Sequence, residues 1–464
     1  MDTGDTAWIL VSTALVMLMT PGLALFYGGM VRAKSVINMM MMSFGALGVI
    51  SVLWVLYGYS IAFGEDVGGG LLGDPSEFFG LSGLMDPEAL SGTIPTMLFV
   101  GFQGMFAVIT VALVSGSIAD RANFWTWLLF AAIWGTVVYF PVAHWVFAFA
   151  DGDGGWIGDR LGAIDFAGGT AVHINAGAAG LALALVLGRR RDFGKGAHRP
   201  HNLPLVMLGA GLLWFGWFGF NAGSAVGANG VAAVALVNTV AATGAAMIAW
   251  IVVEKMRDGH ATSMGAASGV VTGLVAITPA CSALNPIGSL ILGVVAGAIC
   301  SLVVNLKFRL RYDDSLDVVA VHLVGGLVGT IAIGFLATAD APAGVDGLFF
   351  GGGFDQLGRQ IVGAGAVLAY SFVVTYLIGW FLQRTVGFRI DDDHEVVGVD
   401  RVHHGESGYE IGAEEVPDDV LARVEASAAA KAAAAEAGST GSVGSAAAPT
   451  ATKERPVGGD VATA

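Results

Sequence analysis

Charged residues are scarce in this chain. Only 13% of its 464 residues are Asp, Glu, Lys or Arg, whereas 55% are hydrophobic, and the mean hydropathy is +0.72. About a quarter of the residues of an average soluble domain are charged. A chain of this composition has more apolar surface than one core can bury. The shortage of charge therefore excludes an ordinary soluble domain, and we expect much of the surface to face lipid.

Cysteine is rarer still. Cys281 and Cys300 are the two cysteines, and neither has a His or Cys neighbour at the spacing of metal ligands. The His-Glu-x-x-His motif of zinc enzymes is absent, since His394-Glu395 is followed by Val-Val-Gly in a polar segment. We therefore expect buried packing cysteines, and no catalytic site, metal, cofactor or nucleic-acid partner.

Long apolar runs recur along the chain instead. A run of about 20 apolar residues is long enough to cross a hydrocarbon layer of roughly 30 Å. The first run follows Asp2 and Asp5 and precedes Arg32 and Lys34, which is the charge pattern of a retained helix and not of a secretory signal. We predict an all-α integral membrane protein with eleven transmembrane helices, at residues 7–31, 38–63, 93–118, 124–149, 168–188, 202–222, 230–254, 263–280, 285–306, 318–339 and 360–384.

The loops between these runs differ in charge. If successive loops alternate sides, one set carries fifteen Lys and Arg residues and the other only Arg160 and Arg359. Basic loops stay in the cytoplasm, so the amino terminus is expected outside and the carboxyl terminus inside the cell (plasma) membrane. The outer loops are acidic and would attract a cation. Acidic loops and the net charge of −15 also suit a surface solvated in very high salt, which is the interpretation we favour.

The composition changes again after Arg389. Residues 391–415 are polar and acidic, and residues 428–448 are rich in Ala, Gly and Ser, with too few large apolar side chains to form a core. We predict a transmembrane domain over residues 1–390, a cytosolic tail segment over 391–415, and a low-complexity, disordered tail with at most one short helix over 416–464.

Two histidines fall inside the apolar runs. Ionisable groups at membrane depth are costly and are functional candidates for that reason, although a single buried His is more often a packing residue than a site. His173 and His322 lie one and a half to two turns into the fifth and tenth predicted helices. Two successive units of five helices must be inverted relative to each other, because five is odd. We predict two inverted five-helix repeats plus an eleventh helix, with both histidines facing each other at the midplane.

The chemistry of this pair suits a neutral substrate. Burial disfavours the charged form of histidine, so both rings are expected to be neutral. A neutral ring has one donor and one acceptor nitrogen, so two rings can share a hydrogen bond and still present a polar edge to a pore. Carrying a dehydrated ammonium ion through an apolar tube would cost on the order of tens of kcal/mol. Asp165, just before the fifth helix, is expected to cap that helix and, secondarily, to attract cations.

Several strings around these residues resemble the ammonium transporter family, in order and over residues 8–409. They are Asp165-Phe-Ala-Gly-Gly-Thr-Ala-Val-His173-Ile-Asn-Ala-Gly, Gly216-Trp-Phe-Gly-Phe-Asn-Ala-Gly-Ser224-Ala, Pro200-His-Asn-Leu-Pro204, Phe26-Tyr-Gly-Gly29 and Phe102-Gln-Gly-Met-Phe106.

The resemblance implies a homotrimer with one pore per subunit that moves ammonium or ammonia, with methylammonium as a further substrate. His173 and His322 match the paired pore histidines, and Phe106 and Phe220 match the stacked gate. An outer recruitment site, where aromatic faces and a hydroxyl bind the cation, is matched by Phe102, Phe147, Ser224 and Trp217.

One position departs from the family pattern. Phe147 stands where the family usually has tryptophan, and Trp145 lies two residues away, on nearly the opposite face of a helix. Because phenylalanine is the weaker cation–π partner, we expect a shallower outer site.

The tail string Asp400-Arg-Val-His-His404-Gly405-Glu406 resembles the family's regulatory tail, and relatives are blocked by PII-type signalling proteins at the cytosolic face. An ammonium sensor that signals through this tail stays open as the alternative to transport. The related Rh branch would also move ammonia, although the outer-site and gate strings resemble the microbial and plant branch.

Overall fold

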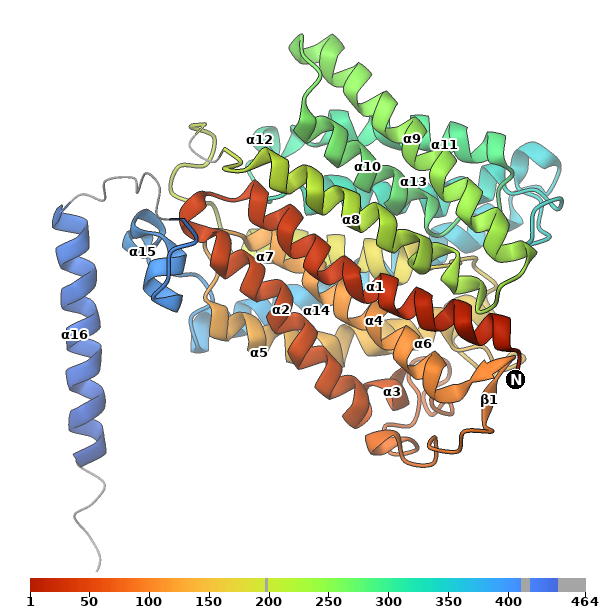
Figure 1. Ribbon diagram of the computed structural model, residues 1–464, viewed down its shortest axis with the longest axis horizontal. Coiled ribbons are helices and arrows are strands. Elements are labelled where there is room, and N and C mark those ends of the chain that lie inside the picture. The colour runs from red at the N-terminus through yellow and green to blue at the C-terminus, as the bar shows by residue number, and fades with distance from the viewer. Residues whose placement is uncertain (197–198, 410–417, 441–464) are drawn as a thin grey trace, which may run out of the picture. The chain divides into compact units, whose positions relative to one another are not determined.

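Eleven apolar helices dominate the computed structural model, which describes residues 1–196, 199–409 and 418–440. Ten of them are long and apolar enough to cross a membrane, and an eleventh, Ser263–Ile277, is shorter. The prediction of eleven helices is confirmed for these described residues, with most ends within a few residues of those expected. Figure 1 shows the long helices between Thr3 and Thr385 running side by side along roughly one direction.

Several of the crossings contain more than one helical segment. The crossings are α1 (Thr3–Met30), α2–α3 (Val36–Leu53 and Tyr59–Phe63, joined by the π-turn Trp54–Gly58), α4 (Thr96–Val114), α5–α6 (Phe124–Trp134 and Phe140–Phe147, joined by the π-turn Gly135–Tyr139), η7–α7 (Gly169–Ile174 and Asn175–Leu187), α8 (Leu203–Asn221), α9 (Gly230–Asp258), α10 (Ser263–Ile277), α11 (Pro286–Val303), η9–α13 (Val319–Val324 and Gly325–Leu336) and α14 (Asp355–Thr385).

Short elements lie between and after the crossings. They are the antiparallel strand pair β1 (Leu90–Ser91) and β2 (Ile94–Pro95), the short helices α12 (Leu306–Leu310) and α15 (Asp392–Val397), the 3-10 turns Ala33–Ser35, Phe79–Leu81, Ser115–Ile118, Gly223–Ala225 and Leu348–Phe350, the π-turns Trp156–Arg160 and Asp400–His404, and the helix α16 (Asp418–Thr440).

Polar caps fix where several helices begin. The side-chain oxygens of Asn123, Asn202, Asn229 and Asn285 accept backbone N–H groups in the first turns of α5, α8, α9 and α11. Such caps satisfy donors that have no partner within the helix. The apolar side chains left exposed on the outer faces, for example Ile287, Val294 and Leu302 of α11, are suited to lipid.

The pairing of helices is that of two repeats. The first crossing of each half, α1 and α8, pack along each other, and the fifth crossing of each half, η7–α7 and η9–α13, pack through contacts of α7 with η9 and of α13 with η7. An inverted repeat places equivalent helices together about its pseudo-two-fold axis in this way.

The chain divides into two compact units, Met1–Ala413 and Glu414–Ala464. The tail segment from Asp391 to Tyr409 packs within the first unit, whereas we had placed a boundary at residue 390. In the second unit, α16 spans 23 residues, longer than the short helix expected there. Alanine has the highest intrinsic helix propensity, so the segment can be helical without a core. Residues 410–417 and 441–464, part of the predicted tail, lie outside the described residues.

Candidate functional site

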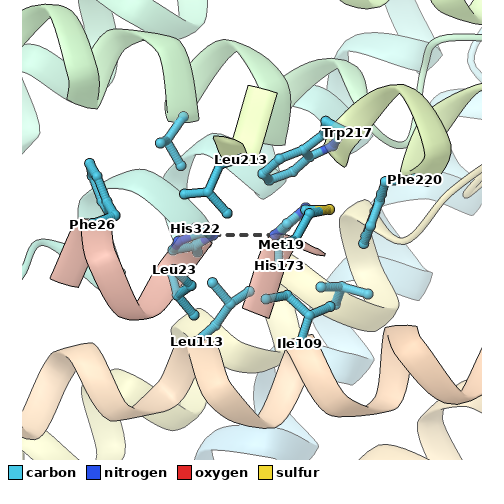
Figure 2. A pocket seen from close by; sticks show the side chains of 12 residues that line it. Met19, Leu23, Phe26, Ile109, Leu113, His173, Leu213, Trp217, Phe220 and His322 are labelled. Atoms are coloured by element: carbon cyan, nitrogen blue, oxygen red, sulfur yellow. Dashed lines mark hydrogen bonds between the residues drawn. The ribbon is translucent and has the colours of Figure 1, made fainter. Parts of the chain in front are cut away.

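His173 and His322 face each other inside the bundle. Their Nδ1 atoms are 3.2 Å apart, and their rings stack at 5.3 Å with an interplanar angle of 24°. The two residues are only 1% and 3% exposed. Since a hydrogen bond between two Nδ1 atoms needs one donor and one acceptor, the pair shares a single proton at this position. Figure 2 shows the two rings at the centre of a pocket.

Both histidines lie in π-helical turns, a feature that hydrophobic patterning does not predict. His173 belongs to η7 and His322 to η9, each of which opens its transmembrane helix. Gly177, one turn after His173, lets the helices touch, since a Cβ there would lie 2.6 Å from both Cα and Cβ of Leu323. Single π-turns are frequent at functional sites.

Each histidine-bearing turn is capped by an aspartate. Oδ1 of Asp165 accepts the N–H groups of Gly168 and Gly169, and its Oδ2 accepts those of Thr170 and Ala171, at 2.6–3.0 Å. Burial raises the pKa of Asp165, although these four N–H groups act to lower it. The expected capping role fits this geometry.

The second cap lies before η9 and was not among the predicted site residues. Asp314 accepts the N–H groups of Val318 and Val319 at 3.1 and 2.7 Å, and burial raises its pKa. Lys307 donates to the backbone oxygen of Asp314 and to the carboxylate of Asp317. The equivalent caps on η7 and η9 are a further sign of the repeat.

The pocket around the histidines is narrow and apolar. Its free volume is about 10 Å³, which is room for about one water-sized molecule. The Nε2 atom of His173 is buried there without a hydrogen-bond partner in the described residues. The pocket is lined, besides the two histidines, by Met19, Leu23, Phe26, Ile109, Leu113, Val172, Leu213, Trp217, Phe220 and Val271. In Figure 2, Phe26 and Phe220 lie on opposite sides of the histidine pair.

Trp217 belongs to this inner pocket. Its ring stacks on His173 at 5.4 Å, and its Nε1 donates to Oγ1 of Thr278 at 2.8 Å. Trp217 does not line the outer cavity described below, although we had grouped it with the outer recruitment residues. Thr278, which anchors it, was not predicted, and no motif in the sequence marks it.

Two phenylalanines separate this pocket from a larger cavity. The rings of Phe106 and Phe220 are 4.3 Å apart at 30°, and Phe220 lies 6.0 Å from the ring of His173. Phe102 packs edge-on against Phe106 at 5.0 Å, fully buried, and does not line the outer cavity. Phe106 and Phe220, the two residues predicted to form a gate, are thus in direct ring contact in a tilted arrangement.

The cavity beyond Phe106 has a volume of about 490 Å³. Asp165, Phe147 and Ser224 line it together with Gln103, which is not among the predicted site residues. The hydroxyl of Ser224 donates to the backbone oxygen of Phe220 at 2.7 Å, so the lone pairs of its Oγ are left to accept a hydrogen bond.

Trp145 points away from this cavity. Its indole packs on Trp156 and Tyr370 and donates to the backbone oxygen of Leu71. This position agrees with the expectation that Trp145 does not replace the family tryptophan at position 147.

The tail segment packs against the start of α2. The buried carboxylate of Asp400 accepts the N–H groups of Ile37 and Asn38 at 2.9 and 2.8 Å, and burial raises its pKa to about 6. Nε2 of His404 lies 3.0 Å from Oδ1 of Asn38. Gly405 has a φ of 68°, a conformation that glycine adopts without strain. Glu406 is exposed.

A buried ion pair at the same end of the bundle was also not predicted. Nε and Nη2 of Arg190 donate to Asp313 at 2.9 and 2.8 Å, and Nη1 donates to Asp120 at 3.0 Å. Burial acts to raise the pKa of Asp313, but the hydrogen bonds and charge of Arg190, with the charge of Arg121, hold it at about 2. Groups of three or more metal-ligating side chains are not found within the residues the structure describes.

Known proteins are similar to this chain over most of its length. The profile of the Ammonium Transporter Family matches residues 7–409. A protein named "Ammonium transporter" from Mycobacterium tuberculosis is 60% identical over 434 residues, which cover 88% of this chain and 91% of the relative. One with the same name from Bacillus subtilis is 46% identical and covers 88% and 99% of the two chains.

Solved structures are similar over most of the chain. Mep2 of Saccharomyces cerevisiae superposes with a TM-score of 0.80 at 35% identity, covering 90% of this chain and 94% of its own. A structure titled "Sensor Amt Protein" has a TM-score of 0.78 at 27% identity and covers 86% and 97%.

Proposed function

The chain belongs to the ammonium transporter family and transports ammonium across the cell membrane as a multi-pass protein, and we propose that its substrate passes the His173–His322 pair as neutral ammonia. The observation that carries this proposal is the apolar pocket of about 10 Å³ around two hydrogen-bonded imidazoles. A full ammonium ion would lose its hydration shell there with few acceptors to replace it, which is very costly.

The route begins at the outer cavity. Phe147 and Phe106 offer aromatic faces, Ser224 offers an acceptor, and the charge of Asp165 lies in the wall, all of which favour a cation. Sodium and potassium ions cannot donate a hydrogen bond to Ser224 and have no proton to release. Methylammonium can donate a hydrogen bond to Ser224 and can release a proton, so we propose it as a further substrate.

The proton leaves at the level of Phe106 and Phe220. The two rings at 4.3 Å close the cavity, so only a small neutral molecule is expected to pass when they part. Beyond them, the free Nε2 of His173 is positioned to hydrogen-bond ammonia or to relay its proton. Ammonia then passes Phe26 and is protonated again inside. A proton that follows separately makes transport electrogenic, and one that stays outside makes it electroneutral.

The charge of the loops and the resemblance to the family support proposals about the oligomer, the orientation in the membrane and the tail. We propose a homotrimer with an independent pore in each subunit, the amino terminus outside and the carboxyl terminus inside. The tail around Asp400, His404, Gly405 and Glu406 is proposed to be regulatory, with a PII-type signalling protein as its candidate partner at the cytosolic face. Because the net charge is −15, we propose that the protein surface is adapted to high salt.

Reconstitution tests the proposal against its alternative. The purified protein is placed in proteoliposomes, an inward ammonium gradient is applied, and membrane current and lumen pH are recorded together beside protein-free vesicles. We expect flux above the protein-free background, with the current deciding between the two modes. Binding of ammonium without flux would instead favour a sensor, the function named by one of the structural neighbours.

A further inference from the structure

The outer cavity is far larger than its assigned substrate requires. Its volume is about 490 Å³, against about 10 Å³ for the pocket at the histidines, which suffices for one small molecule. Extra volume that served only as a water-filled funnel would be expected to have a mainly polar lining, as porin channels do. The lining of this cavity is instead mainly apolar and aromatic.

Five phenylalanines line the cavity: Phe99, Phe106, Phe147, Phe149 and Phe166. They extend from Phe106 at its floor, which is buried, to Phe149, which is 69% exposed. The polar side chains among the described lining residues are Gln103, Asp165 and Ser224, so one carboxylate is the only ionisable group. Aromatic faces with a nearby negative charge and no competing cation are the chemistry that binds organic cations.

Basic groups near the cavity are already neutralised. Arg359 approaches the wall at Gly162, but its guanidinium pairs with Asp355 at 2.7 Å. The segment 64–92, on the same side by the alternation of loops, contains six acidic residues and no basic one. The local field therefore favours cations of any size.

We propose that this cavity binds quaternary ammonium cations, which block the transporter from outside without being transported. The inference rests on the proposed function of the same cavity and adds a second ligand class. A quaternary ammonium has no N–H group and presents its charge through C–H groups, so it requires aromatic faces and no hydrogen-bond acceptor. The five phenylalanines supply such faces over a volume that an ammonium ion leaves unfilled.

The same cation cannot go further. It has no proton to release at Phe106 and Phe220, whose rings are 4.3 Å apart, and it is too large for the free space beside His173. A bound quaternary ammonium therefore excludes ammonium competitively and remains outside.

Tetramethylammonium chloride is the probe that tests this inference. Uptake of labelled methylammonium is measured in cells that express the full chain, with increasing tetramethylammonium outside and sodium chloride at equal ionic strength as the reference. We expect the apparent KM for methylammonium to rise several-fold with Vmax unchanged. Normal uptake that tetramethylammonium leaves unaffected would overturn the inference, whereas absence of methylammonium uptake without any blocker would count against the proposed function itself.

Two matched substitutions locate the site. Phe149→Ala is expected to weaken the block roughly two- to fivefold, the loss of one cation–π contact. Phe354→Ala, at an equally exposed phenylalanine (71%) that does not line the cavity, is expected to leave the block unchanged. Ser224→Ala is expected to weaken methylammonium binding more than tetramethylammonium block. Equal effects of Phe149→Ala and Phe354→Ala would overturn the assignment.

A binding measurement separates charge from apolar contact. Choline and its uncharged isostere 3,3-dimethylbutan-1-ol are titrated into the purified protein. Binding of choline alone supports cation recognition by the aromatic faces. Equal binding of both compounds, or of neither, would show that the cavity is not a cation site.

Discussion

Replacing Asp165 by Asn tests how the first histidine is held. The carboxylate satisfies four N–H groups, two on each oxygen, at the start of the turn that carries His173. An asparagine has one acceptor oxygen, so in either orientation two N–H groups lose their acceptor and face an amide donor instead. Although Asn has nearly the same shape, it is therefore not a neutral substitution here.

The size of the effect follows from this count. A buried donor without a partner costs about 1–3 kcal/mol, so two of them cost about 2–6 kcal/mol. Burial raises the pKa of Asp165, so replacing its charged carboxylate by a neutral amide also removes a desolvation cost. We therefore expect a loss of stability at the lower end of this range, about 2 kcal/mol. The N–H of His173 bonds to the oxygen of Gly168 at the same turn, so loosening the turn displaces the imidazole. A misplacement of about 1 Å can reduce a rate by roughly a hundredfold.

Methylammonium uptake and the apparent melting temperature of the purified protein measure the two consequences. We expect Asp165→Asn to lower both. Asp159→Asn is the control, because Asp159 also accepts three backbone N–H groups, those of Ala150, Gly152 and Gly154, but none in the turn that carries His173. Unchanged uptake and melting in Asp165→Asn would refute the reasoning. Lost uptake with unchanged melting would show that the charge, and not the cap, is what matters.

Three further predictions concern the outer site, the helix contact and the buried ion pair. Phe147→Trp is expected to lower the KM for ammonium-dependent uptake roughly two- to fivefold, since tryptophan is the stronger cation–π partner; unchanged or weaker affinity counts against this. Gly177→Ala places a Cβ 2.6 Å from Leu323 and is expected to abolish most uptake, whereas Gly365→Ala, with open space at its Cβ, is expected to retain it; similar uptake in both variants would refute the close approach. Because folding lowers the pKa of Asp313 to about 2, this carboxylate contributes about 2 kcal/mol to the free energy of unfolding above pH 4, and the contribution is lost as the pH falls towards 2. Asp313→Asn should therefore have a lower melting temperature at neutral pH and should lack this pH dependence. A wild-type acid profile in that variant would contradict the assignment.

Much of this fold could be predicted because lipid imposes a simple rule on sequence. Apolar length fixed the helices, as for α9, which was predicted at residues 230–254 and spans Gly230–Asp258. The meeting of His173 and His322 followed from their equivalent depth in two halves of five helices. Both inferences use only the hydropathy of the sequence and the number of helices, so neither requires knowledge of side-chain packing.

Other features depend on packing and could not be read from the sequence. The π-turns at η7 and η9 differ from α-helix by one hydrogen-bond register, which leaves no periodic signal. Trp217 was grouped with Ser224, but Trp217 lies within α8 and lines the inner pocket, whereas Ser224 lies in the turn after α8 and lines the outer cavity. The helix α16 shows the converse case, in which alanine propensity gives a helix where a lack of apolar residues had favoured disorder.

The role of the paired histidines in transport is tested by comparing the wild type with the double variant His173→Leu, His322→Leu in proteoliposomes under the same ammonium gradient. Leucine fills a similar space but can neither hydrogen-bond ammonia nor carry a proton. We expect substrate flux well above that of protein-free vesicles for the wild type and near that background for the double variant, with equal melting temperatures showing that both proteins are folded. Wild-type flux through the double variant would contradict the claim that ammonia passes by way of the paired imidazoles.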